Sequence, residues 1–175
     1  EFRRVLFRSL TIEFTYAGLP TPPTNAGSYE VIGTINDPIY QGSASGSLVI
    51  GKESQTITFA AITDKLTTES VNLSATGGGS NNPVTFAVTS GPGVIANNVL
   101  TFTTSGSVTI TASQVGNDNY IAAPEVSRTF NVTKAMATVT LGSLVQTFNN
   151  TPRAATATTT PADLNVEFTY AGSTT

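Results

Sequence analysis

Apolar and polar residues alternate with a period of two over short runs along most of the chain. Successive side chains of a β-strand point to opposite faces, so this alternation predicts strands with one buried and one exposed face. The middle of the chain holds six such runs, whose apolar positions are Ile57, Phe59 and Ala61; Val71, Leu73 and Ala75; Val84, Phe86 and Val88; Leu100 and Phe102; Val108, Ile110 and Ala112; and Phe130 and Val132. No window has the 3.6-residue period of an amphipathic helix.

Residues that favour turns separate these runs. Such residues stand at 77–79 (GGG), 81–83 (NNP), 91–93 (GPG) and 97–98 (NN), each between two predicted strands. Strands with one apolar face need a second layer to cover that face, and two antiparallel sheets packed face to face provide it. We therefore predict an all-β chain built from immunoglobulin-like antiparallel β-sandwich modules.

The chain also repeats itself over a long interval. Residues 10–18 (LTIEFTYAG) recur as residues 164–172 (LNVEFTYAG), with seven of nine positions identical at a separation of 154 residues. A fainter repeat relates residues 36–40 (NDPIY) to residues 117–120 (NDNY), and each is followed by a strand and a lysine. Self-similarity at fixed separations is typical of tandem structural units.

These repeats divide the chain into three parts. We expect residues 53–134 to form one complete Ig-like β-sandwich. Residues 10–52 are then the C-terminal part of a second kind of module, and residues 135–175 are the N-terminal part of its next copy, so both flanking modules are incomplete. The linkers are only a few residues long, which predicts a semi-rigid rod.

The first nine residues match nothing else in the chain. They read EFRRVLFRS and carry three of the eight basic residues. The peptide resembles the translation of a common sequencing-adapter oligonucleotide, and we interpret residues 1–9 as an assembly artefact. Without them, five basic and ten acidic residues remain. This sparse acidic balance argues against nucleic acid and anionic membranes as partners, and no run of 18 apolar residues is present to span a membrane.

The composition excludes several kinds of chemistry, because the chain has no His, no Cys and no Trp. Zinc, haem and iron–sulfur sites are built on His and Cys ligands. Ser-His-Asp and Cys-His nucleophile pairs need the same residues. We therefore expect no enzyme, no catalytic residue and no cofactor.

Several motifs resemble known module families. The flanking parts resemble the MBG-type repeat domains of large bacterial surface and secreted proteins, through residues 141–144, 146–148, 151–152, 160–162, 23–29, 35–38 and 40–42. The centre resembles a bacterial Ig-like domain, through residues 55–59, 83–86, 90–92, 106–110, 112–114 and 119–120. Residues 148–150 (FNN) depart from the MBG pattern, which more often has Tyr, an acidic residue and Gly there. The resemblance implies an exported, adhesin-like protein at the bacterial cell surface.

Two turns carry the candidate site residues. Asp37 and Asp118 stand at equivalent places in Asn-Asp turns and are candidate calcium ligands. Calcium takes six to eight oxygens, usually from several carboxylates, whereas each turn supplies one; Asn and Asp also stabilise turns by bonding to their own backbone, and we favour that structural role. Tyr40 and Tyr120 follow the turns, and we predict a structural role for both, with a hydroxyl that ties a sandwich corner to the backbone.

Two functions remain open from the sequence. The favoured interpretation is a non-catalytic stalk or spacer repeat of an extracellular protein, whose partners are the neighbouring modules of the same chain. The alternative is an adhesion module that binds glycans or mucin, which only the family resemblance favours. Because residues 135–175 lack the strands that residues 10–52 contain, we also expect head-to-tail self-association of this chain.

Overall fold

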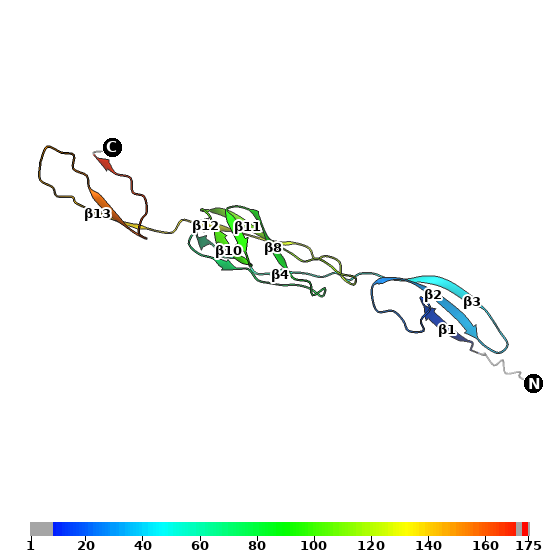
Figure 1. Ribbon diagram of the computed structural model, residues 1–175. Helices are drawn as coiled ribbons and strands as arrows, with labels where there is room; N and C mark the ends of the chain where they lie inside the picture. The colour runs from blue at the N-terminus through cyan, green and yellow to red at the C-terminus, as the bar shows by residue number, and fades with distance from the viewer. Residues whose placement is uncertain (1–8, 171–172, 175) are drawn as a thin grey trace, which may run out of the picture.

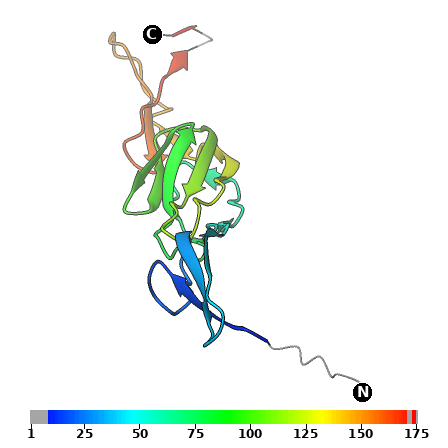
Figure 2. The same ribbon diagram turned by 90° about the vertical axis from the view of Figure 1, so that its right-hand side faces the viewer.

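The computed structural model describes residues 9–170 and 173–174, so the interpretation of residues 1–8 lies outside the described residues. The chain forms an extended row of three bodies, with a compact sandwich in the middle (Figures 1 and 2). The first strand lies at one end of the row and the last strands lie at the other. All regular elements of the described residues are strands, and none of these residues forms a helix that could cross a membrane.

The central body consists of two sheets. One contains β5 (Lys65–Leu66), β12 (Val126–Thr133), β11 (Gly106–Ser113) and β8 (Thr85–Ser90) in that order. The opposing layer contains β6 (Val71–Asn72), β10 (Val99–Phe102) and β9 (Gly93–Ala96), together with the pair of β4 (Thr58–Phe59) and β7 (Ala75–Thr76). All of these pairs are antiparallel except β5 with β12, which is parallel.

The strand order identifies the architecture. Named in chain order, β4–β5, β6–β7, β8, β9, β10, β11 and β12 take the places of strands A to G of an immunoglobulin domain. The pairs β4–β7, β6–β10 and β10–β9 then form the A-B-E-D sheet, and β8, β11 and β12 form the C-F-G sheet. The first strand is shared between the two sheets, because β4 pairs in one and β5 in the other. The predicted immunoglobulin-like β-sandwich is confirmed.

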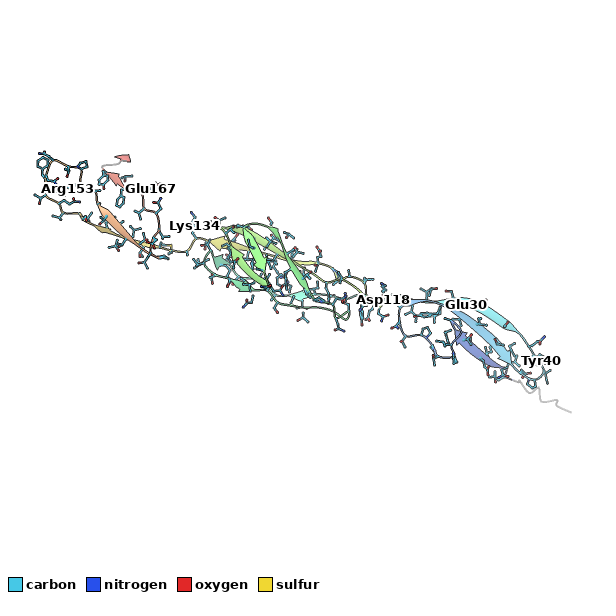
Figure 3. All side chains as sticks on the ribbon, viewed as in Figure 1. Glu30, Tyr40, Asp118, Lys134, Arg153 and Glu167 are labelled. Atoms are coloured by element: carbon cyan, nitrogen blue, oxygen red, sulfur yellow. The ribbon has the colours of Figure 1, made fainter. Side chains whose placement is uncertain are left out.

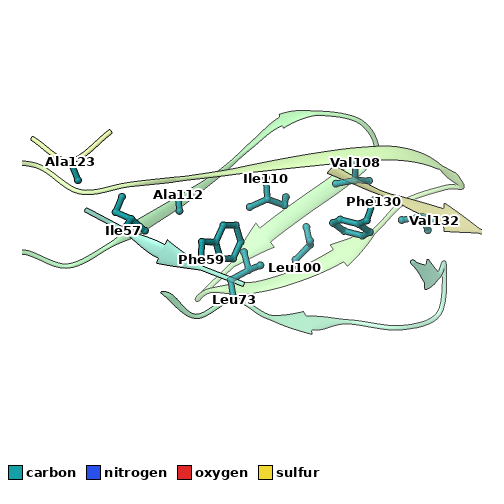
Figure 4. Close-up of a cluster of buried hydrophobic side chains, with 10 residues drawn as sticks. All are labelled: Ile57, Phe59, Leu73, Leu100, Val108, Ile110, Ala112, Ala123, Phe130 and Val132. Atoms are coloured by element: carbon teal, nitrogen blue, oxygen red, sulfur yellow. The ribbon is translucent and has the colours of Figure 1, made fainter. Parts of the chain in front are cut away.

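The core of the sandwich fills the space between these sheets (Figure 4). Its buried side chains are Ile57, Phe59, Leu73, Leu100, Val108, Ile110, Ala112, Ala123, Phe130 and Val132. Two aromatic contacts span the layers, Phe59 with Phe86 at 5.3 Å and Phe102 with Phe130 at 5.8 Å between ring centroids. Nearly every apolar position predicted from the alternation is buried or half-buried. Ala61 is the exception: it is exposed, because β4 ends at Phe59 and the chain leaves the sheet before Ala61.

The two flanking bodies are single layers. Residues before the sandwich form one antiparallel sheet of β1 (Thr11–Tyr16), β2 (Gly27–Asn36) and β3 (Ser43–Ile50), with β2 in the middle. Residues after it form the antiparallel pair β13 (Thr138–Gly142) and β14 (Thr156–Thr160), followed by the short pair β15 (Thr169–Tyr170) and β16 (Ser173–Thr174). We call these bodies the head sheet (residues 11–50) and the tail (residues 138–170).

Candidate functional site

The two Asn-Asp turns have the same hydrogen-bond geometry but not the alignment that we predicted. The carboxylate of Asp37 accepts from the backbone N–H groups of Ile39 and Tyr40, at 2.8 and 3.0 Å. In the second turn the acceptor is the amide oxygen of Asn117, at 2.9 and 3.0 Å from the backbone nitrogens of residues 119 and 120. The equivalent of Asp37 is therefore Asn117 and not Asp118, because the distance to the following tyrosine sets the register of the turn.

The carboxylates of the two candidate calcium ligands, Asp37 and Asp118, lie in different surroundings. Asp37 caps its own turn, and Asp118 is exposed at the boundary between the sandwich and the head sheet (Figure 3). Elsewhere, Asp64 accepts the backbone N–H of Asn131 at 2.8 Å and Glu69 accepts that of Leu66 at 2.6 Å. Within residues 9–170, no three His, Cys, Asp or Glu side chains come together as a metal site would require.

The two candidate tyrosines lie in different surroundings. Tyr120 is half-buried, and its ring lies directly over Gly79, where an added Cβ would come within 2.5 Å of the ring. Tyr40 is 56% exposed at the far end of the head sheet (Figure 3). For neither hydroxyl does the described part of the structure contain a hydrogen bond, so both residues are placed by their turns, and Tyr120 also by the contact of its ring with Gly79. Their structural role stays a prediction.

A buried polar network lies beneath the second turn, at the end of the sandwich that faces the head sheet. Gln55 and Gln114 are only 5% and 3% exposed. Gln55 donates to the backbone oxygens of residues 115 and 121 at 3.2 and 2.9 Å and accepts the N–H of Ser80 at 2.9 Å. Gln114 donates to the backbone oxygen of Asn82 at 2.7 Å and accepts the N–H of Gly78 at 2.8 Å. The loop backbone here is withdrawn from water and is not paired in a sheet. The two glutamine side chains supply the hydrogen-bond partners that strand pairing would otherwise provide.

Three consecutive glycines make room for this network. An added Cβ at Gly78 would lie 2.5 Å from the Cβ of Gln55, and one at Gly77 would overlap the amide of Gln114. We predicted residues 77–79 only as a turn between strands. None of the three has a positive φ, so the glycines are required here for close approach rather than for a special backbone conformation.

We expect the Gln55→Ala variant to lose about 3 kcal/mol of unfolding free energy, because the N–H of Ser80 and the backbone oxygen of Ile121 would lose their partner and each such loss costs about 1–3 kcal/mol. Chemical denaturation followed by tyrosine fluorescence measures this. The matched control is Thr56→Ala, the exposed neighbour, which we expect to change the free energy by less than about 0.5 kcal/mol. Equal, small effects of both variants would contradict the role assigned to Gln55.

The same end of the sandwich holds the head sheet. The side chain of Asn119 accepts the backbone N–H of Ala26 at 2.8 Å and donates to the side chain of Asn25 at 3.0 Å. Across the linker, the ammonium group of Lys52 donates to the backbone oxygen of Asn117 at 2.8 Å. Glu53 exchanges backbone hydrogen bonds with residues 119 and 121 at 2.8 and 2.9 Å. The turn at 117–120 is thus the contact between the two bodies.

We expect Asn119→Ala to loosen this contact, because both side-chain bonds to the head sheet are lost while the backbone pairing of Glu53 remains. Backbone ¹⁵N relaxation measures the result as a fall in the rotational correlation time of residues 11–50 relative to that of the sandwich. Asp118→Ala is the matched control, since no bond joins Asp118 to the head sheet among the described residues. Unchanged relaxation in Asn119→Ala would show that the side chain does not hold the junction.

The junction at the other end of the sandwich is different. Ala135 donates to the hydroxyl of Thr67 at 3.4 Å, but among the described residues no hydrogen bond joins residues 138–170 to the sandwich. Met136, in the linker, is 91% exposed. The junction between the head sheet and the sandwich is therefore held by hydrogen bonds between the two bodies, whereas the tail is joined to the sandwich by the linker alone.

The head sheet carries one uncovered apolar face. In the pairing of β1 with β2, Ile12 lies opposite Ile35 and Phe14 lies opposite Gly33. These side chains line a groove of about 660 Å³, whose other apolar lining residues are Val31, Ala44 and Leu48. Ile12 and Phe14 are 52% and 50% exposed. Ser43, Ser45 and Ser47 are its polar lining residues, and no carboxylate or basic side chain lines the groove to activate them, so it is suited to packing rather than to chemistry.

Comparison with known proteins finds a family model and a solved structure that are similar to this chain. No curated protein matches the chain significantly. The crystal structure of human protocadherin-24 EC1-2 is similar at 12% identity and a TM-score of 0.32, over 60% of this chain and 65% of that one. Residues 8–54 and 137–175 match the family model described as the MBG domain. The chain is thus similar to the MBG domain in two separate segments, on either side of a sandwich with immunoglobulin strand order.

Proposed function

We propose that this chain is a non-catalytic spacer segment of an extracellular bacterial surface protein, in which MBG-type and Ig-like modules alternate. The MBG domain is a repeat module of extracellular proteins, and two segments of the chain match it. The modules that we propose are residues 53–134 as a complete sandwich, with residues 10–52 and 135–175 as parts of two MBG-type modules.

The bonded junction at residues 117–120 is the observation that carries this proposal. A spacer has to keep its modules in line, and the side chain of Asn119 together with the ammonium group of Lys52 fastens the head sheet to the end of the sandwich. The turn at 37–40 lies at the corresponding end of the head sheet and has the same capping geometry. It therefore supplies the contact for a module on that side, and the row can continue.

Small-angle X-ray scattering at concentrations where the chain is monomeric tests the proposal. We expect an elongated particle whose maximum dimension does not change between low and physiological salt, because the junction is held by neutral hydrogen bonds and one ammonium–carbonyl bond rather than by long-range charge. A compact or salt-dependent shape would contradict a spacer. A glycan and mucin array, with and without calcium, provides the second arm: saturable binding to a defined sugar would favour the adhesion module instead.

A further inference from the structure

The head sheet has two faces of opposite character. One face is the apolar groove, and the other carries serine and threonine side chains, including the bonded hydroxyls of Ser28 and Ser47 at 2.9 Å. On β3 the two faces alternate, so Leu48 lies in the groove and Val49 lies on the polar side. A β-sheet with one apolar face is stable in water when a second layer covers that face, and no element of the described chain covers this one.

The tail carries a second apolar face. Val139 and Leu141 alternate with threonines on β13 and are 53% and 52% exposed. In the register with β14, Leu141 lies opposite Ala157. The tail is therefore a two-stranded layer whose apolar side is as open as the groove of the head sheet.

The internal repeat relates the two faces. Residues 164–172 duplicate residues 10–18, which contain β1. In the tail, Tyr170 accepts the backbone N–H of Ala155 through its hydroxyl at 2.9 Å. The residue of the head sheet that corresponds to Tyr170 is Tyr16. The bond joins the repeated strand of the tail to the segment that precedes it, and the repeat offers the same kind of contact at Tyr16 of β1.

The two faces cannot meet within one chain. The head sheet and the tail lie at opposite ends of the row, with the whole sandwich between them (Figure 1). The tail of the same chain therefore does not cover the groove, and the duplicated strand points to a second copy of this chain as the partner that carries the matching layer.

We propose that the groove of the head sheet binds residues 138–160 of a second copy of this chain, so that β13 and β14 form the missing layer over β1, β2 and β3. The duplicated strand of the incoming tail is displaced, because β1 already occupies its position. The displaced strand forms no ladder with β13 or β14, so its removal breaks side-chain contacts such as the bond of Tyr170 to Ala155 rather than backbone pairing. Each chain then offers one groove and one tail at opposite ends, so the contact is heterologous and forms open rows of increasing length rather than a closed dimer.

The points at which the chain enters the sandwich and the tail are compatible with this head-to-tail contact. Within the chain, Glu53 enters the sandwich beside the turn that ends in Tyr120. The corresponding entry point of the tail is Ala135, one residue after Lys134 as Glu53 is one residue after Lys52. We expect Ala135 of one copy to lie beside Tyr40 of the next, where Ile39 and Tyr40 are 71% and 56% exposed.

The chain has no cysteine, so introduced cysteines report the contact directly. Ala44→Cys in the groove and Ala157→Cys in the tail are made in separate full-length chains and mixed under mild oxidation. We expect a disulfide-linked heterodimer. The matched control pairs Val49→Cys with Thr158→Cys, which lie on the opposite faces of the same two layers, and we expect at least tenfold less product. Equal yields from the two mixtures would overturn the proposal.

Sedimentation velocity tests the same contact without a cross-link. We expect the sedimentation coefficient of the wild-type chain to rise with concentration, and Leu48→Asp to abolish the rise while Val49→Asp preserves it. Leu141→Asp and its neighbour Thr140→Asp repeat the comparison from the tail, so misfolding of one body cannot imitate the result. A wild-type chain that stays monomeric up to millimolar concentration would overturn the proposal. The proposal concerns the ends of this chain and does not depend on the spacer function.

Discussion

Replacing Leu100 by alanine is expected to lower the unfolding free energy of the central sandwich by about 3–4 kcal/mol. Leu100 is fully buried on β10, in the middle of the layer that faces β8, β11 and β12 (Figure 4). Removing a buried leucine side chain loses its transfer free energy and leaves a cavity, and such variants lose about 2–5 kcal/mol. For a domain of this size the melting temperature falls by roughly 15 °C.

Differential scanning calorimetry measures this effect. The control is Val94→Ala on the neighbouring strand β9, where the side chain is 49% exposed; we expect a loss of less than about 1 kcal/mol because little apolar surface is withdrawn from water there. If Leu100→Ala melted with the wild-type chain, the core assigned to the interface of the two sheets would be wrong.

Gly91→Ala is expected to be nearly as damaging, for a different reason. Gly91 has a φ of +89° in the turn after β8, a conformation that costs a residue with a Cβ about 1–2 kcal/mol. The added Cβ would also overlap the backbone oxygen of Ser107 on β11, and relief of such overpacking costs about 1–3 kcal/mol. We expect a combined loss of about 3 kcal/mol, from the strain and the overlap together.

Urea denaturation measures this loss, with Ser90→Ala as the control. Ser90 is the exposed residue before Gly91, and its substitution leaves both the turn and β11 unobstructed. If Gly91→Ala were as stable as Ser90→Ala, the turn would have to adopt another conformation than the one described.

The alternation of apolar and polar residues was sufficient to predict the sandwich, because each strand buries only one face. Val108, Ile110 and Ala112 follow the pattern without exception and are all fully buried. The pattern missed two short strands at sheet edges. β5 and β9 were not predicted, since two- and four-residue strands at a sheet edge leave little periodic signal.

The polar network was missed although its signal was present. Gln55 is in phase with the inward positions Ile57 and Phe59, and Gln114 is in phase with Ile110 and Ala112. A glutamine at an inward position needs buried partners. Three adjacent glycines elsewhere in the module could have indicated the backbone that approaches it.

The alignment of Asp37 with Asp118 was wrong, because the spacing to the following tyrosine, and not the shared Asn-Asp dipeptide, sets the register of the turn.

The uncovered groove could be predicted only in part. The repeat of residues 10–18 indicated that both flanking bodies are incomplete. The shape of the groove depends on Gly33 and Gly46, which face it between larger apolar residues. Pairing register decides which residues share a face, and that register was not available from the alternation alone.

The distance between the head sheet and the sandwich shows whether the modules are fastened in a row at residues 117–120. Spin labels at Thr34→Cys and Thr101→Cys, both exposed positions in strands, would be measured by double electron–electron resonance in a large excess of unlabelled chain. We expect a single narrow distance distribution, which broadens when Asn119→Ala is added. A broad distribution in the chain with Asn119 intact would contradict a spacer held in line by this junction.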